Sequence, residues 1–191
     1  MSPEPGSPST PLTERLRSVV LVEGTSDQVA VETLAELRGV SLVNERVEIV
    51  PIGGAQAIGR FVAHFDPEGV ALAGLYDVAE EPEFKRALGE DLEQLGFFAC
   101  EPDLEGELIR ALGAEAVEAV ADANGDLGAF RTLQKQPAWR GEPVEEQLRR
   151  FMGSGGSRKI RYARLLVEAL DSVAVPRPLQ LVLERALSGP G

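Results

Sequence analysis

The chain has 191 residues, and 19 lysines and arginines against 31 aspartates and glutamates give it a formal net charge of -12. A hydrophobic content of 43% can build the core of one domain and excludes disorder for most of the chain. One cysteine and one histidine exclude a disulfide framework and a cysteine- or histidine-rich zinc site. Because no apolar run could span a bilayer and the first residues do not resemble a signal peptide, we expect a cytoplasmic protein without membrane contact.

The first residues of the chain differ in composition from the rest. Proline, serine and glycine dominate as far as Pro11, and no large apolar residue follows Met1 until after that proline. Such a segment cannot bury enough apolar surface to offset the entropy of ordering. We therefore predict a disordered tail over residues 1–13.

From Ser18 to Cys100, short runs of apolar and β-branched residues alternate with helical patterns. This alternation is typical of βαβ units that form a parallel sheet. The expected strands are residues 18–22, 47–52, 70–76 and 96–100. The expected helices between them begin near residues 25, 53 and 83, and the third is expected to end near residue 94.

After Glu101 the strand patterns stop and only helical patterns follow. The expected helices are residues 103–112, 114–123, 127–134, 144–151, 159–170 and 179–186. Glycine and serine at 153–157 predict a flexible loop. We therefore expect an α/β core over residues 14–105, and a helical subdomain over residues 106–191 that packs on it.

Acidic residues follow three of the four expected strands. Glu23 and Asp27 follow the first strand, Asp77 ends the third, and Asp103 and Glu105 follow the fourth. Since the carboxyl ends of parallel strands meet at one edge of a sheet, these carboxylates are expected to converge there. Hard oxygen ligands select magnesium, manganese or calcium. The alternative is that each acid only favours the dipole of a helix that starts nearby.

The residues from Val19 to Asp27, VVLVEGTSD, resemble the first motif of a Toprim domain, the catalytic fold of topoisomerases, bacterial primases and several nucleases. The order of motifs is more closely similar to the Toprim region of the OLD (overcoming lysogenization defect) family nucleases. Those proteins carry a glutamate after the first strand, an aspartate after the third, a later Asp-x-Glu and a lysine in a further helix. Here the last two are Asp103-Leu104-Glu105 and Lys159, and the resemblance covers residues 18–170.

This resemblance implies a Toprim-like, Rossmann-like α/β fold with about four parallel strands flanked by helices. It also implies a divalent-metal-dependent nuclease that hydrolyses phosphodiester bonds, with DNA as the substrate and two magnesium or manganese ions as cofactors. The implied metal ligands are Glu23, Asp27, Asp77, Asp103 and Glu105. The implied catalytic residues are Glu23, which could instead act as a general acid or base, and Lys159, whose charge would stabilise the transition state. Without the resemblance, Lys159 would be read as one more basic residue on a solvated helix.

Two features depart from the family pattern. The usual Asp-x-Asp is here Asp77-Val78-Ala79, so Glu80 or Glu81 would have to supply the second carboxylate. Full-length OLD proteins also carry an ATPase, whereas no Gly-x-x-x-x-Gly-Lys-[Ser/Thr] occurs in this chain. The resemblance is therefore to a stand-alone Toprim region, with a separate ATPase subunit as a possible partner.

The basic residues gather in one segment. Between Arg131 and Arg164 lie nine lysines and arginines and three glutamates, a local charge of +6, so the remainder carries -18. Trp139 and Tyr162 lie in the same segment and could stack on the bases of single-stranded or frayed nucleic acid. The alternative is that these cations pair with the acidic sheet domain.

Two rival functions stay open at this point. One is a catalytically decayed Toprim module that binds nucleic acid or a partner ATPase, with Ala79 as the sign of decay. The other is a phosphohydrolase that acts on a small phosphorylated metabolite and does not need the basic segment.

Overall fold

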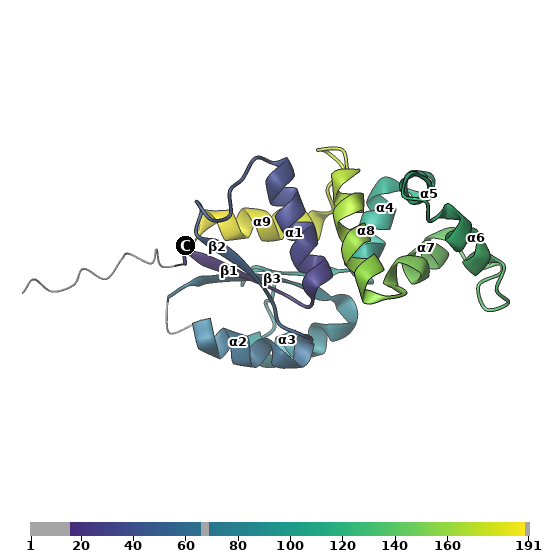
Figure 1. Ribbon diagram of the computed structural model, residues 1–191. Helices are drawn as coiled ribbons and strands as arrows, with labels where there is room; N and C mark the ends of the chain where they lie inside the picture. Colours follow the sequence, from purple (N-terminus) through teal and green to yellow (C-terminus); the bar gives the residue numbers. More distant parts are fainter. Residues whose placement is uncertain (1–15, 66–68, 190–191) are drawn as a thin grey trace, which may run out of the picture.

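The sheet forms the centre of the molecule in the computed structural model, which describes residues 16–65 and 69–189 (Figure 1). The expected tail over residues 1–13 lies outside the described residues. Four parallel strands follow the order β2-β1-β3-β4, which confirms the predicted α/β class. The strands are β1 (Ser18–Val22), β2 (Val47–Pro51), β3 (Ala71–Asp77) and β4 (Phe97–Cys100).

Strand β1 is the most buried strand because it pairs on both edges and is covered on both faces. All five of its residues are buried, and Val20 lies opposite Ile49 of β2 and Ala73 of β3. Gly74 pairs with Phe97 of β4, and a Cβ atom at Gly74 would lie 2.6 Å from that ring. A glycine is therefore required for β3 and β4 to approach so closely.

Helices cover both faces of the sheet. On one face lie α1 (Thr25–Leu37) and α9 (Arg177–Ser188), and on the other lie α2 (Ile58–Phe65) and α3 (Glu81–Leu88) (Figure 1). The short 3-10 turns η1 (Ala55–Ala57) and η3 (Val78–Glu80) precede α2 and α3. Alternate residues of β1 face the two layers, as expected for a strand with helices on each side.

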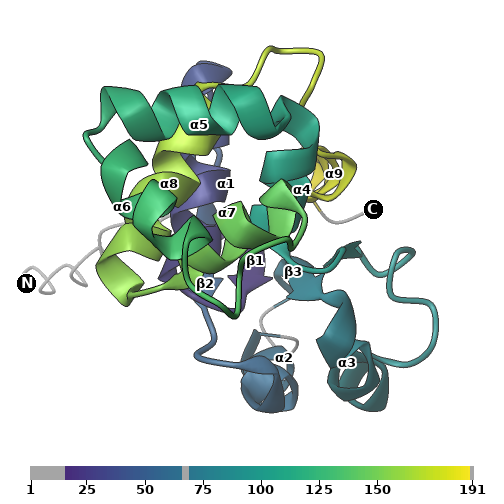
Figure 2. The ribbon, with the colours of Figure 1, turned by 90° about the vertical axis from the view of Figure 1, so that its right-hand side faces the viewer.

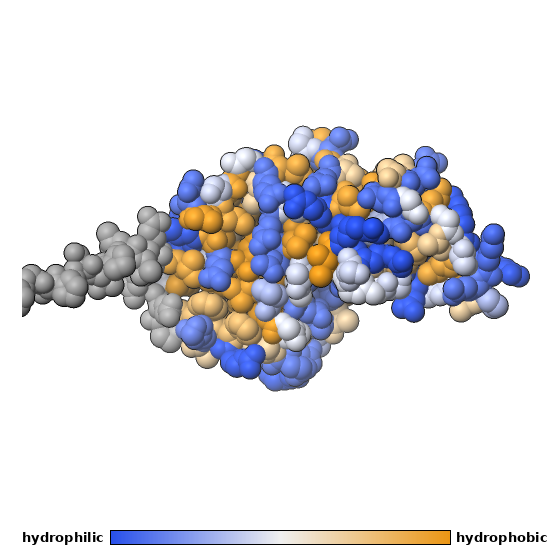
Figure 3. Space-filling view, viewed as in Figure 1, coloured by the Kyte–Doolittle hydropathy of each residue, from blue (hydrophilic) through white to orange (hydrophobic). Residues whose placement is uncertain are grey.

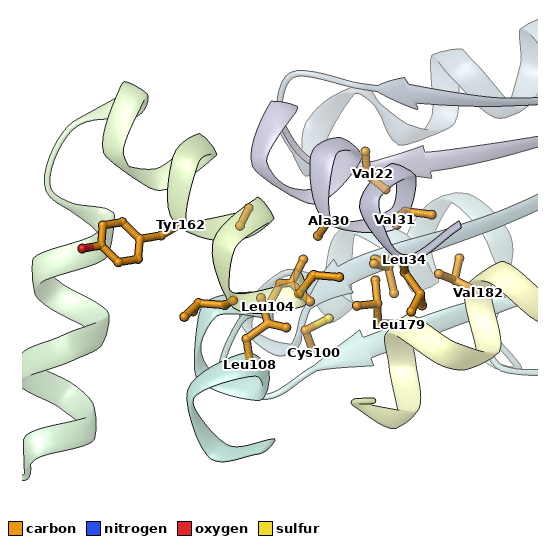
Figure 4. Close-up of a cluster of buried hydrophobic side chains, with 14 of the residues drawn as sticks. Val22, Ala30, Val31, Leu34, Cys100, Leu104, Leu108, Tyr162, Leu179 and Val182 are labelled. Carbon is orange, nitrogen blue, oxygen red and sulfur yellow. The ribbon is translucent and has the colours of Figure 1, made fainter. Parts of the chain in front are cut away.

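The remaining helices gather beyond the carboxyl ends of the strands (Figures 1 and 2). They are α4 (Leu104–Leu112), α5 (Ala114–Ala123), α6 (Leu127–Gln134), α7 (Val144–Gly153) and α8 (Gly156–Glu168). Helix α8 packs along α1, and α7 packs on α4. One buried cluster therefore continues from the sheet into these helices, from Val22 through Leu104 to Tyr162 (Figure 4).

Three local features differ from the expected pattern. Helix α3 ends at Leu88 and not near residue 94, because Gly89 adopts a φ of 101° that ends the helix. The expected loop at 153–157 is mostly helical, and Gly155, with a φ of 103°, makes the short link between α7 and α8. Helix α9, which was expected to belong to the helical subdomain, packs on β1, β3 and β4 of the sheet. The division of the chain at residue 105 stays a prediction.

The surface carries no membrane-spanning element among the described residues, since none of their helices is long and apolar enough to cross a bilayer. Figure 3 shows hydrophilic residues gathered over α8, at the end of the molecule where α4–α8 lie. Two basic residues of α8, Arg161 and Arg164, are exposed there.

Candidate active site

The acidic residues predicted from the sequence surround one edge of the sheet. Asp77 ends β3, and its pKa is raised to about 8, first by burial and then by the charges of Glu23, Asp27 and Asp103. These carboxylates come from three separate loops and act on one another, as the topology predicts. Glu23 is positioned by the backbone, because its carbonyl accepts a hydrogen bond from the Gly53 N–H at 3.0 Å.

Lys159 enters the same acidic region from α8. Its Nζ lies 3.3 Å from Oε1 of Glu105, a residue that is only 5% exposed. Burial lowers the pKa of Lys159, but the charges of Glu105, Asp27 and Asp77 raise it above its ordinary value, so the ammonium stays charged. Burial raises the pKa of Glu105 to about 7 although Lys159 opposes the rise. The lysine is thus the cation that partly compensates this buried carboxylate.

Two of the acids also have the capping role that was the alternative explanation for them. Oδ2 of Asp27 accepts a hydrogen bond from the Gly24 N–H at 3.0 Å, and burial raises the pKa of this carboxyl. Asp103 caps α4, since its Oδ1 accepts from the Gly106 N–H at 2.8 Å. Its Oδ2 accepts from Nε of Arg149 at 2.6 Å. Each oxygen of Asp103 therefore already accepts one hydrogen bond, and each keeps a second lone pair.

The turn after β3 determines which acid replaces the missing second aspartate. In η3 the side chain of Ala79 is exposed, whereas Glu80 is partly buried and its Oε2 is fully buried without a hydrogen-bond partner among the described residues. The pKa of Glu80 is raised to about 7, first by burial and then by Glu23. Glu81 points elsewhere, because it pairs with Lys85 at 2.7 Å. Of the two candidates, Glu80 is the one that faces the acidic region.

The acidic side chains do not yet form a closed coordination shell. Across residues 16–65 and 69–189, no three aspartate, glutamate, histidine or cysteine side chains stand where together they could hold one ion. The donor atoms are of the right type for magnesium or manganese, and like charge raises the pKa of several of them. The side chains would have to rotate to share an ion.

The basic segment is partly neutralised by ion pairs. Arg149 pairs with Asp103, and Arg164 pairs with Glu36 of α1 at 3.0 Å, which supports the alternative of pairing with the sheet domain. Several cations of the segment, however, form no salt bridge with any described residue. They are Lys135, Arg140, Arg150 and Arg158.

The two aromatic residues predicted to stack on bases have different surroundings. Tyr162 is 1% exposed, and its hydroxyl donates to Oδ2 of Asp126 at 3.0 Å, so it is a core residue and the prediction for it was wrong (Figure 4). Its place at an inward-facing position of α8 explains the burial. Trp139 is partly exposed in the loop between α6 and α7, where it lines a pocket of about 280 Å³.

Arg149 and the buried Gln147 have roles that the sequence pattern does not indicate. Arg149 holds Asp103, and Gln147 donates to the carbonyl of Trp139 at 2.8 Å. Neither contact has a signal in the sequence, because each joins residues whose proximity depends on how α7 packs. The only hint was the position of Gln147 beside Leu148 on the apolar face of α7, where a glutamine is unexpected.

The fold and the acidic edge of the sheet define a Toprim-like class of protein. Residues 16–78 match the family described as "Overcoming lysogenization defect protein-like, TOPRIM domain". Within residues 16–78 the chain thus resembles an OLD-like Toprim domain, and its fold is similar to that of the C-terminal region of OLD proteins.

Solved structures of the C-terminal regions of two OLD proteins resemble the chain. The C-terminal region of the Burkholderia pseudomallei OLD protein matches with a TM-score of 0.68 and 16% identity, over 91% of this chain and 98% of that one. The C-terminal region of the Xanthomonas campestris pv. campestris OLD protein, phased with iodine, matches with a TM-score of 0.64 and 25% identity, over 91% and 95%. No curated protein matches the sequence. These likenesses extend through the helices beyond the matched Toprim segment.

Proposed function

We propose that the chain is a divalent-metal-dependent nuclease that hydrolyses phosphodiester bonds in DNA. The observation that carries this proposal is the buried group of carboxylates at the strand ends with Lys159 beside it, at 3.3 Å from Glu105. The match of residues 16–78 to an OLD-like Toprim domain supports it, because this segment contains Glu23, Asp27 and Asp77.

The residues suit magnesium or manganese as the cofactor. The donors are carboxylate oxygens. The buried Oε2 of Glu80 has no donor among the described residues, and a hydrogen bond with the neighbouring Glu23 requires a proton between the two carboxyls, a place that a cation can take. Glu23, Asp27, Asp77, Asp103 and Glu105 would hold the metal, with Glu80 in place of the absent second aspartate. Two divalent ions would activate the attacking water and stabilise the leaving oxygen.

The protein's own residues would have distinct tasks in this reaction. Arg149 fixes the carboxylate of Asp103 at 2.6 Å, which keeps the start of α4 and thus Glu105 in place. Lys159, on α8, would offer its ammonium to the negative charge that accumulates on the phosphate in the transition state. Glu23, directly after β1, would bind the metal or transfer a proton.

A second candidate is favoured by a specific observation. Because no three acidic side chains stand ready to hold one ion within the described residues, the chain could be a decayed module that binds nucleic acid or a separate ATPase. Ala79 in place of the second aspartate points the same way.

A plasmid-nicking assay tests the proposed function. The wild-type protein should nick supercoiled DNA with manganese and not with a chelator. Glu23→Ala and Lys159→Ala should each reduce the rate by about 100-fold or more, since each removes a charge that acts on the reacting group. Matched controls are Glu48→Ala on the exposed side of β2 and Lys135→Ala in the basic segment, both of which should retain activity.

The outcome separates the candidates. Nicking that survives Glu23→Ala and Lys159→Ala would belong to a contaminant and would refute the assignment. If the folded wild-type protein binds DNA but leaves it intact with both manganese and magnesium, the decayed module replaces the nuclease.

A further inference from the structure

The pocket beside the acidic site is too small for a duplex and about large enough for one nucleotide. Its volume of about 280 Å³ is at the lower end of the range of about 300–1,000 Å³ that is usual for small-molecule sites. It shares Glu105 and Lys159 with the acidic site, so a group bound in it would lie next to the carboxylates. Its wall combines the carboxylates of Asp103, Glu105 and Glu146 with the cations of Arg149, Arg150 and Lys159, and is completed by Trp139 and Gly153.

The loop that carries Trp139 is held in place by a buried side chain. Gln147 of α7 is 6% exposed, and its Nε2 donates to the carbonyls of Trp139 at 2.8 Å and Glu142 at 3.0 Å. Its Oε1 accepts from Nε2 of Gln134 at 2.6 Å. A buried amide is costly unless it is hydrogen-bonded, and here its polar atoms are used to fix this loop. The backbone that carries the indole is therefore held at the pocket wall.

The core does not require this tryptophan. The aromatic residues that pack the neighbouring helices are Phe130 and Phe151, whose ring centroids lie 5.5 Å apart, and both are at most 2% exposed. Trp139 instead stays partly exposed. A large flat ring at the edge of a concave site, carried by an anchored backbone, is suited to contact a flat ligand.

Of the three cations that line the pocket, two form ion pairs with carboxylates of the described residues and one does not. Lys159 pairs with Glu105, and Arg149 pairs with Glu146 at 3.4 Å as well as with Asp103. Arg150 forms no salt bridge within the described part of the chain, and it is exposed. The pocket thus combines an aromatic ring on an anchored backbone with a guanidinium that no described carboxylate pairs with, which is the complement of a base joined to a phosphate.

We propose that this pocket binds one nucleotide of single-stranded DNA, with the base against Trp139 and a phosphate at Arg150. This inference rests on the proposed function and specifies the form of its substrate, because a base inside a duplex is stacked between its neighbours and cannot contact the indole. The strand that enters the site is then a single-stranded or frayed segment next to the bond to be cleaved.

Trp139 is the single tryptophan of the chain, so its fluorescence reports on this pocket alone. The full-length protein is titrated with an unstructured oligothymidylate, with a blunt duplex and with thymidine monophosphate, in calcium buffer. We expect saturable quenching by the oligothymidylate, much less by the duplex, and weak binding of the monophosphate. Absence of quenching by the single strand overturns the proposal, and so does equal quenching by the duplex.

Variants separate stacking from a general effect of the loop. By anisotropy of a labelled oligothymidylate, Trp139→Ala should weaken binding about tenfold, whereas Trp139→Phe should keep most of the affinity. Arg150→Ala should also weaken binding, while Arg86→Ala, an exposed arginine of α3, should not. If Trp139→Ala binds as the wild type does, the base does not stack there and the proposal fails.

The binding test of the pocket and the nicking test of the proposed function can fail independently of each other. If the protein nicks DNA with manganese but single strands do not quench its tryptophan fluorescence, the nuclease function stands and the pocket assignment fails. A protein whose tryptophan is quenched by single strands but that never cleaves them retains the pocket and loses the nuclease. Tight binding of thymidine monophosphate, equal to that of the oligothymidylate, would overturn the strand assignment in favour of a small-molecule ligand.

Discussion

Replacing Asp77 by asparagine is expected to stabilise the metal-free protein above neutral pH. Burial and the charges of Glu23, Asp27 and Asp103 raise the pKa of Asp77 to about 8, with Lys159 opposing the rise. A carboxyl whose pKa is raised on folding stabilises the folded state fully below its unfolded pKa, here 3.8, and loses that contribution as the pH rises to about 8. Asparagine has nearly the same shape and carries no charge, so it removes this loss.

The size of the effect follows from the rise in pKa. From 3.8 to about 8, at about 1.4 kcal/mol per pH unit, the upper limit is about 6 kcal/mol of unfolding free energy. Because water screens a carboxyl that is not completely buried, we expect about 1–3 kcal/mol. For a chain of this length that corresponds to a rise in Tm of about 2–10 °C.

Thermal melts in a chelating buffer measure this gain. Asp77→Asn should melt above the wild type at about pH 9 and close to it at about pH 4, and the control Asp171→Asn, in an exposed loop, should melt like the wild type at both. Manganese should raise the Tm of the wild type more than that of Asp77→Asn. If Asp77→Asn melts at or below the wild type at high pH, the carboxylates do not repel one another as described.

Three further predictions address the neighbouring features. Glu80→Gln should weaken manganese binding about tenfold in calorimetry, whereas Glu81→Gln should leave it unchanged, and equal affinities would show that Glu80 is not part of the site. Gln147→Ala should lower the unfolding free energy in urea by about 1–3 kcal/mol and shift the tryptophan emission to the red, because two backbone carbonyls lose their donor. A stable variant with unchanged emission would contradict the clamping role. Gly74→Ala should lower the unfolding free energy by about 1–3 kcal/mol or more, since the new Cβ would lie 2.6 Å from a buried ring. Gly128→Ala, with open space at its helical position, should raise it by about 0.5–1 kcal/mol, so a reversed order would refute the packing argument.

The strands were predictable because each is short, apolar and bounded by turn residues. The pattern around β1 predicts Ser18–Val22 and the structure has the same bounds, since a strand buried on both faces leaves a continuous apolar run. Helix α3 was placed too far because its apolar spacing continues after Leu88, while the backbone turns at Gly89. The positive φ of Gly89 ends the helix although the apolar spacing of the sequence continues.

The acids at the strand ends were predictable as a group, but their individual surroundings were not. Their order along the chain follows from parallel topology, which sequence patterns reveal. The engagement of Asp103 by Arg149, 46 residues later, depends on the packing of α7 on α4. The direction of Glu80 depends on the 3-10 turn, which exposes Ala79 and turns the next side chain inward.

The basic segment was predictable in charge but not in accessibility. Tyr162 and Trp139 lie in the same basic stretch and looked alike as stacking partners. Tyr162 lies on the buried side of α8, whereas Trp139 lies in a loop that Gln147 holds at the edge of a pocket. That difference comes from tertiary contacts, which the sequence pattern does not specify.

Anomalous diffraction from crystals soaked in manganese would locate the metal at the candidate site. We expect manganese peaks at the carboxyl edge of the sheet, within coordination distance of Glu23, Asp77 and Glu105, with Lys159 nearby. A structure in which these side chains bind no manganese, or in which the ion binds only elsewhere on the acidic surface, would contradict this expectation.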